Sequence, residues 1–224
     1  MENINAVADQ AHQVFEARTR ARDQALLQAR QLTRHAANAI RAIHRTEIDL
    51  ANEHLAQARL LVESLTDNLI HQFPDLFYAG YTQDAIKEFA EASITCALIQ
   101  DLPLPMPEEL GLENRYATYL NGLAEVVGEL RRRCLDILRQ GYSQEAERLL
   151  TCMDEIYTLL VTMDYPDAIT NGLRRQTDLA RGIVERTRGD LTISLREEQL
   201  KINLEKFMER LDRQGSNDAD HPGV

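Results

Sequence analysis

The sequence predicts an all-α protein. Residues 1–73, the first third of the chain, contain neither Gly nor Pro, and aromatic residues make up 5% of the 224 residues, with no Trp. No run of β-branched and aromatic residues alternates with polar ones between turn residues, so strand signals are missing. This composition is typical of helical proteins. We expect a single domain over residues 1–212, followed by a disordered tail over residues 213–224.

The N-terminal region, residues 4–72, reads as one very long helix or as two helices with a break, because its apolar residues recur at spacings of three and four. It is also the most basic part of the chain, with seven arginines and one acid between Arg18 and Arg45. Four of these arginines fall within about 60° of one helix face. This arginine stripe consists of Arg30, Arg34, Arg41 and Arg45. The pattern has two interpretations of equal weight. The stripe is either a solvated helix face, or a surface that binds phosphates or an acidic partner.

A helix is expected over residues 83–100, after a compact turn that begins at Pro74. At about 100° per residue, its acids form one stripe. The members of this stripe are Asp84, Glu88 and Glu91, followed by Thr95. Because the opposite side is apolar, we expect this helix to pack on one side only and to offer its carboxylates on the other.

The second half of the chain contains a proline-rich loop over residues 101–115 and four further helical segments. Helices are expected over 117–139 and 144–160, and a long one over 168–195, which a short amphipathic helix over 196–210 follows. The long helix carries a second basic patch. Its members are Arg174, Arg175, Arg181, Arg186 and Arg188.

Two of these helices each carry a pair of acids that share a helix face. Glu88 and Glu91 are spaced by three residues, and Glu125 and Glu129 by four. If the helices are neighbours the four carboxylates converge, and such a cluster requires a hard divalent cation, Mg²⁺ or alternatively Mn²⁺. The plainer alternative is that both pairs face solvent. Glycines on both sides of Glu125, at positions 122 and 128, indicate that a helix or a substrate approaches closely there.

The sequence lacks the motifs of several other kinds of functional site. The six histidines include no HExxH and no Glu-x-x-His, the three cysteines have no CxxC spacing, and there is no P-loop or GxGxxG. The sequence has no leader and no apolar run of membrane length, so we expect a cytoplasmic protein without a membrane partner. The net charge of −11 argues against nucleic-acid binding over the whole surface. The arginines are instead concentrated on two helices, which suits a local phosphate-binding surface, and a single strand fits such a surface better than a duplex because no groove-reading module is present.

Three segments resemble landmarks of the translin family. They are EFAEA at 88–92, YLNGLAEVVGELRRRC at 119–134 and LRRQTDLARGIVERTRGDLTI at 173–193, and LTRHAANAIRAIHR at 32–45 is similar to the first basic helix of the family. The closest match is the catalytic branch, translin-associated factor X. The resemblance implies a bundle of about seven helices with long antiparallel members, assembly into a hollow octamer, and Mg²⁺-dependent cleavage of single-stranded RNA.

The resemblance also assigns roles to the acids. The catalytic, metal-binding acids of the family stand where Glu88, Glu91 and Glu125 stand here, although the third is usually Asp. Glu129 is an acid in both branches of the family, so it is a fourth catalytic acid or a structural one.

The leading hypothesis is therefore an endoribonuclease that acts on single-stranded RNA, with a carboxylate-bound metal that activates water. Two alternatives stay open: a non-catalytic, translin-like oligomer that binds single-stranded RNA or DNA, and an all-α nucleotide pyrophosphohydrolase. The expected assembly is a homo-oligomer, an octamer by resemblance, or a hetero-oligomer with a translin-like subunit.

Overall fold

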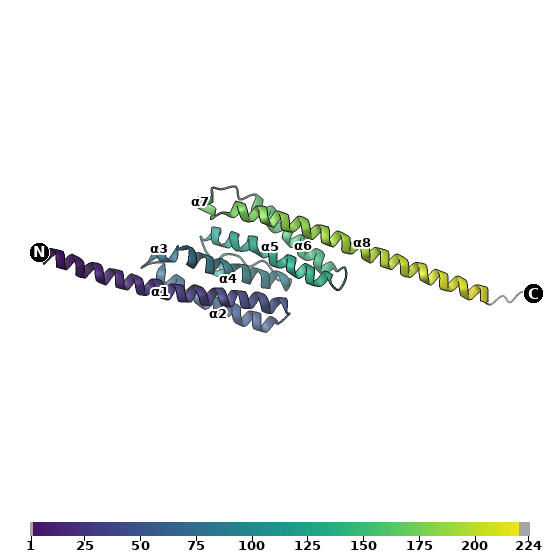
Figure 1. Cartoon of the computed structure of the whole chain (residues 1–224), viewed down its shortest axis with the longest axis horizontal. Helices are drawn as coiled ribbons and strands as arrows, with labels where there is room; N and C mark the ends of the chain where they lie inside the picture. The colour runs from purple at the N-terminus through teal and green to yellow at the C-terminus, as the bar shows by residue number, and fades with distance from the viewer. Residues whose placement is uncertain (1, 220–224) are drawn as a thin grey trace, which may run out of the picture.

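A computed structural model describes residues 2–219 of the chain and confirms the all-α class. Within these residues there are eight α-helices, one short 3₁₀ turn at Glu108–Leu110 and no strand. The helices are α1 (Glu2–His44), α2 (Ile48–Leu69), α3 (Pro74–Phe77), α4 (Gly80–Ile99), α5 (Tyr116–Leu138), α6 (Gln144–Val161), α7 (Asp167–Thr170) and α8 (Leu173–Ala219). Since α3 and α7 are single turns, six long helices form the bundle (Figure 1).

The N-terminal region consists of two helices, so the version with a break is the one that the structure adopts. The break is a tight turn after His44, in which Thr46 has a φ of 64°, and α2 then packs back along α1. At the other end the two expected helices are one, because α8 continues from Leu173 without interruption. It extends to Ala219, into the stretch expected to be a disordered tail, and residues 220–224 lie outside the described part.

Helix α4 lies in the middle of the bundle, between the α1–α2 hairpin and α5 (Figure 1). Thirteen of its twenty residues are buried, including Glu91 and Thr95 on the polar stripe. The expectation that α4 packs on one side only is therefore wrong. Neighbouring helices cover the part of the polar stripe that contains Glu91 and Thr95, whereas Asp84 is exposed and Glu88 is partly exposed.

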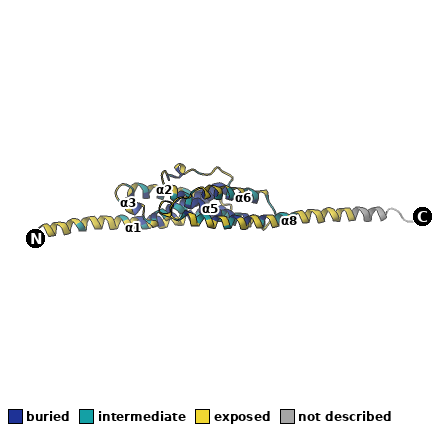
Figure 2. Cartoon of the chain, turned by 90° about the horizontal axis from the view of Figure 1, so that it is seen from above, coloured by how far each residue is buried: buried dark blue, intermediate teal, exposed yellow. Residues whose placement is uncertain are grey.

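Two long helices project beyond the bundle at its opposite ends, as Figures 1 and 2 show. We call residues 3–20 of α1 the N-arm and residues 196–211 of α8 the C-arm; nearly all of their side chains are exposed. The exposed large apolar residues of the N-arm are Ile4, Val7, Val14 and Phe15, and those of the C-arm are Leu200, Ile202, Leu204, Phe207, Met208 and Leu211. None of the described helices is long and apolar enough to cross a bilayer.

Candidate metal centre and nucleic-acid surface

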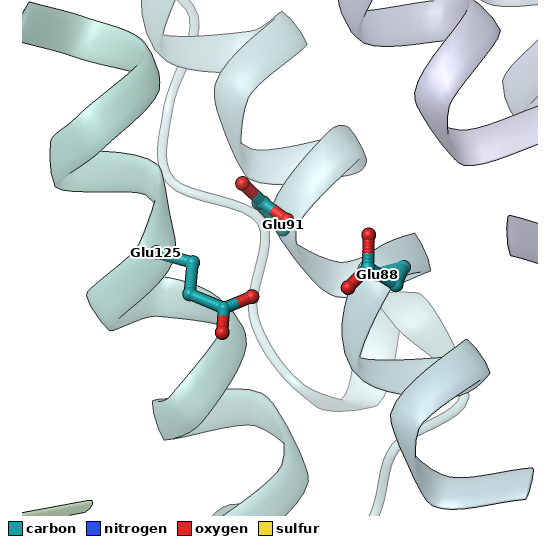
Figure 3. Close-up of side chains that lie close together, drawn as sticks. All are labelled: Glu88, Glu91 and Glu125. Atoms are coloured by element: carbon teal, nitrogen blue, oxygen red, sulfur yellow. The ribbon is translucent and has the colours of Figure 1, made fainter. Parts of the chain in front are cut away.

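Three carboxylates from two neighbouring helices converge where α4 packs against α5. Glu88 and Glu91 project from α4 and Glu125 from α5, and one oxygen from each lies within 4.8 Å of the others (Figure 3). Mg²⁺ binds oxygens at about 2.1 Å, so opposite ligands in its shell are about 4.2 Å apart. Small side-chain rotations would therefore bring these oxygens to ligand distance. The all-oxygen donor set also fits Mg²⁺ or Mn²⁺ better than softer ions.

A glycine on α5 allows the two helices to approach at this point. A Cβ on Gly122 would lie 2.9 Å from the carbonyl oxygen of Lys87 and 3.2 Å from the amide nitrogen of Glu91. The backbone of α4 therefore occupies the space that any larger residue would need. A neighbouring helix thus approaches closely at Gly122, as expected, but not at Gly128, where a Cβ would meet no protein atom within 4 Å.

Glu91 is the most deeply buried of the three acids. Burial, followed by the charges of Glu125, Glu88 and Glu129, raises the pKa of Glu91 to about 8, while Lys87 opposes this shift. Without a bound cation, the Glu91 carboxyl therefore holds a proton at neutral pH. A divalent ion would have to displace that proton in order to bind.

Two residues that the sequence did not single out hold Glu125. The Lys87 ammonium donates a hydrogen bond to Glu125 Oε1 at 2.7 Å and lies 2.6 Å from Oε2, and Gln176 Nε2 of α8 donates to Oε1 at 3.1 Å. Lys87 also lies 3.4 Å from Glu88 Oε1. In the sequence, a lysine beside a glutamate has the same appearance as a surface ion pair, so no signal pointed to Lys87.

Glu129 lies apart from the cluster of three. One of its oxygens is 2.6 Å from Nε2 of His44, whose side chain is only 3% exposed, and Arg132 approaches the same oxygen at 3.6 Å. The hydrogen bond from His44 is the main cause that lowers the pKa of Glu129, against an opposing effect of burial. This fourth acid therefore joins α5 to the end of α1. The side chain of its neighbour His44 is almost completely covered.

The arginine stripe lies on the outer side of α1, and its four side chains are exposed. Arg45 pairs with Glu47 at 2.6 Å, and Arg41 donates to the side-chain oxygen of Asn38. Arg30 lines a groove of about 390 Å³ between α1 and α4, together with Glu88. One end of the stripe thus shares a groove with Glu88, one acid of the cluster.

The second basic patch is divided between two sides of α8. Arg174, Arg181 and Arg188 recur every seven residues and share one side, where Arg188 pairs with Asp154 of α6 at 2.6 Å. Arg175 and Arg186 lie about 100° or more around the helix from them. All five are exposed, but they do not form one continuous surface.

Comparisons with known proteins give a consistent assignment. No family model matches the chain. An uncharacterized protein of Methanocaldococcus jannaschii is 32% identical over 186 residues, which cover 83% of this chain and 81% of that protein. The crystal structure of AfC3PO, from Archaeoglobus, superimposes with a TM-score of 0.75 at 31% identity and covers 83% of this chain and 95% of its own. The chain belongs to the C3PO family of translin-like proteins.

Two further C3PO structures agree in fold. AfC3PO in complex with duplex RNA matches with a TM-score of 0.74 at 32% identity, over 83% of this chain and 95% of that one. Apo-NeC3PO, from Nematostella, has a TM-score of 0.75 at 17% identity, and the match covers 83% of this chain and 96% of that one. At this identity it supports the fold alone. The resemblance to the translin family is therefore confirmed. The catalytic, metal-binding and RNA-binding roles of individual residues of this C3PO chain stay predictions.

Proposed function

We propose that the protein is a metal-dependent endoribonuclease. The observation that carries the proposal is the convergence of Glu88, Glu91 and Glu125, which offer three carboxylates from two helices within 4.8 Å. Membership of the C3PO family supports RNA as the ligand, since AfC3PO was solved with duplex RNA. The same evidence favours RNA over the free nucleotide that a pyrophosphohydrolase would require.

Each residue around the site has a distinct part in this proposal. A bound Mg²⁺ would stabilise charge on the phosphate oxygens and lower the pKa of a water molecule. Glu88, Glu91 and Glu125 would hold the ion, and Glu91 gives up its proton when the ion binds. Gln176 orients Glu125 through its hydrogen bond. Glu129, which His44 fixes beside the cluster, adds negative charge without contributing to the group of three.

The arginine stripe is the proposed surface for the RNA backbone. It is about 22 Å long, and its exposed guanidinium groups can contact phosphates without regard to sequence. Arg30 lies in the same groove as Glu88, so a strand that follows the stripe would arrive at the acid cluster. The preference for single strands rested on the lack of a groove-reading module. The AfC3PO complex with duplex RNA argues against excluding duplexes, so both forms are candidate substrates.

The test uses one fluorescent RNA, offered both as a single strand and as an annealed duplex, with the purified full-length protein in Mg²⁺. The variants are Glu91→Gln, which removes a proposed ligand, and Glu63→Gln, which removes an exposed acid of α2 as the matched control. We expect wild type and Glu63→Gln to cut at least one form, and EDTA or Glu91→Gln to abolish cutting. Equal cutting by Glu91→Gln, or cutting that persists in EDTA, would show that the acid cluster is not the active site.

A non-catalytic RNA-binding protein is the second candidate, and the Lys87 contact favours it because an ammonium already neutralises Glu125. It predicts binding that weakens with salt, through the arginines, and no cutting in Mg²⁺ or Mn²⁺. Binding of either RNA form without cleavage in both ions would select this candidate, unless an added translin-like subunit restores cleavage.

A further inference from the structure

The Lys87 ammonium contacts two of the three acids of the cluster, Glu125 and Glu88. It lies 2.6 and 2.7 Å from the two oxygens of Glu125 and 3.4 Å from an oxygen of Glu88, and the lysine side chain is 19% exposed. Together with Gln176, it engages both carboxylate oxygens of Glu125. The acid that α5 contributes to the proposed site is therefore already bound by groups of the protein itself.

We propose that Lys87 is an internal counter-cation of the acid cluster, which a divalent ion must displace from Glu125, and that it thereby sets the affinity of the site for the ion. The inference rests on the proposed metal site and adds a regulating residue to it. Lys87 is a positioning residue here, because it acts through Glu125.

The geometry favours this displacement. A metal ion that Glu125 binds at about 2.1 Å would lie at most about 4.8 Å from the ammonium in its present position. Two cations at that distance in a half-buried site repel each other, and the ion competes with the ammonium for the oxygens of Glu125. The flexible four-carbon stem of lysine allows the ammonium to swing away without a movement of the helix.

The presence of Lys87 also explains how the acids are held together when no ion is bound. Burial alone would lower the pKa of Lys87, but the hydrogen bond and the charge of Glu125, followed by those of Glu88, raise it overall. The lysine is therefore fully charged at neutral pH. Without it, Glu125 would keep only the hydrogen bond from Gln176 and the acids would lose their nearest positive charge, so removal of the lysine should destabilise the ion-free protein and strengthen ion binding.

The experiment measures Mn²⁺ binding to the purified full-length protein by electron paramagnetic resonance, alongside thermal unfolding in EDTA and in Mn²⁺. The variants are Lys87→Met, which keeps the length of the side chain, and Lys87→Gln, which is polar and serves as the second variant if the first folds poorly. Lys87→Arg keeps the charge, and Lys201→Met removes an exposed lysine of the C-arm as the matched control.

We expect Lys87→Met and Lys87→Gln to bind Mn²⁺ roughly tenfold tighter than wild type, or more, because a hydrogen bond to a charged group no longer competes. In EDTA both should unfold at a lower temperature, and Mn²⁺ should raise that temperature more than in wild type. Lys87→Arg should not gain affinity, and Lys201→Met should match wild type.

Folded Lys87 variants with unchanged or weaker Mn²⁺ binding would overturn the inference and leave the proposed function intact, provided that wild type binds Mn²⁺ and Glu91→Gln does not. If neither wild type nor the Lys87 variants bind Mn²⁺, the metal site itself is wrong and the inference falls with it.

Discussion

Glu91 carries a proton at neutral pH in the ion-free protein, since burial and the charges of Glu125, Glu88 and Glu129 raise its pKa from 4.5 to about 8. Between these two values the folded chain binds a proton that the unfolded chain has lost. The free energy of unfolding therefore falls as the pH rises through this window. This one group contributes a slope of up to about 1.4 kcal/mol per pH unit.

The Glu91→Gln variant should show this effect directly, because glutamine resembles the protonated acid at every pH. In EDTA, wild type should lose stability relative to Glu91→Gln as the pH is raised from 5 to 8. Urea unfolding of both proteins across that range provides the measurement. Mg²⁺ at pH 8 should reverse the order by stabilising wild type alone. Two stability curves that stay parallel in EDTA would mean that Glu91 is charged throughout.

The acids of the site could be predicted from the sequence, whereas their partners could not. Spacings of three and four residues place Glu88 with Glu91, and Glu125 with Glu129, on shared helix faces. Glu129 lies outside the cluster and instead contacts His44, which is 85 positions away in the chain. No local pattern reports such a contact, and Lys87 escaped notice for the same reason.

At the scale of elements, the distance between α4 and α5 is set at Gly122. An alanine there would place its Cβ 2.9 Å from a backbone oxygen of α4, closer than real Cβ atoms come, so the helices would have to separate. We expect Gly122→Ala to cost about 1–3 kcal/mol of stability and to weaken Mn²⁺ binding, because Glu125 moves away from Glu91.

Gly128 provides the matched control on the same helix. Its surroundings are open, so Gly128→Ala should stabilise the protein by about 0.5–1 kcal/mol through the higher helix propensity of alanine, with Mn²⁺ binding unchanged. Urea unfolding and Mn²⁺ titration of the two variants test the pair. If Gly122→Ala and Gly128→Ala had the same stability and the same Mn²⁺ affinity, the close approach of α4 and α5 would not control metal binding at the site.

The helices themselves were largely predictable, because apolar periodicity, Pro74 and the proline-rich loop fix most of their ends to within a few residues. The packing of α4 was not predictable in the same way. Its polar stripe indicated an exposed side, but Glu91 and Thr95 are buried where neighbouring helices cover that stripe. Periodicity shows which face is polar, and it does not show whether another helix covers that face.

At the scale of the whole molecule, both arms carry apolar residues in the spacing of helix–helix seams. In the C-arm, Leu200, Leu204, Phe207 and Leu211 follow one another at intervals of four, three and four, and all are exposed. Exposed rows of this kind mark protein interaction surfaces. We expect the C-arm to contribute to self-association.

Leu204→Glu should therefore lower the molar mass of the assembly, because it places a charge in the middle of the C-arm row. Gln199→Glu adds the same charge on the polar side of this arm and should leave the mass unchanged. Light scattering coupled to gel filtration, over a range of protein concentrations, distinguishes the two. A Leu204→Glu protein with the mass of wild type would exclude the C-arm from the interface.

The two arms point away from the bundle in opposite directions (Figure 1). A subunit with one attachment surface at each end can join two neighbours. The angle between the two ends then decides whether the copies form a ring or a filament. If the rotation from one subunit to the next brings the last copy back to the first, the subunits form a closed ring with a fixed number of copies. Any other rotation produces an open filament. The straightness of α1 and α8 would in that case determine how many copies assemble, even though neither arm touches the acid cluster.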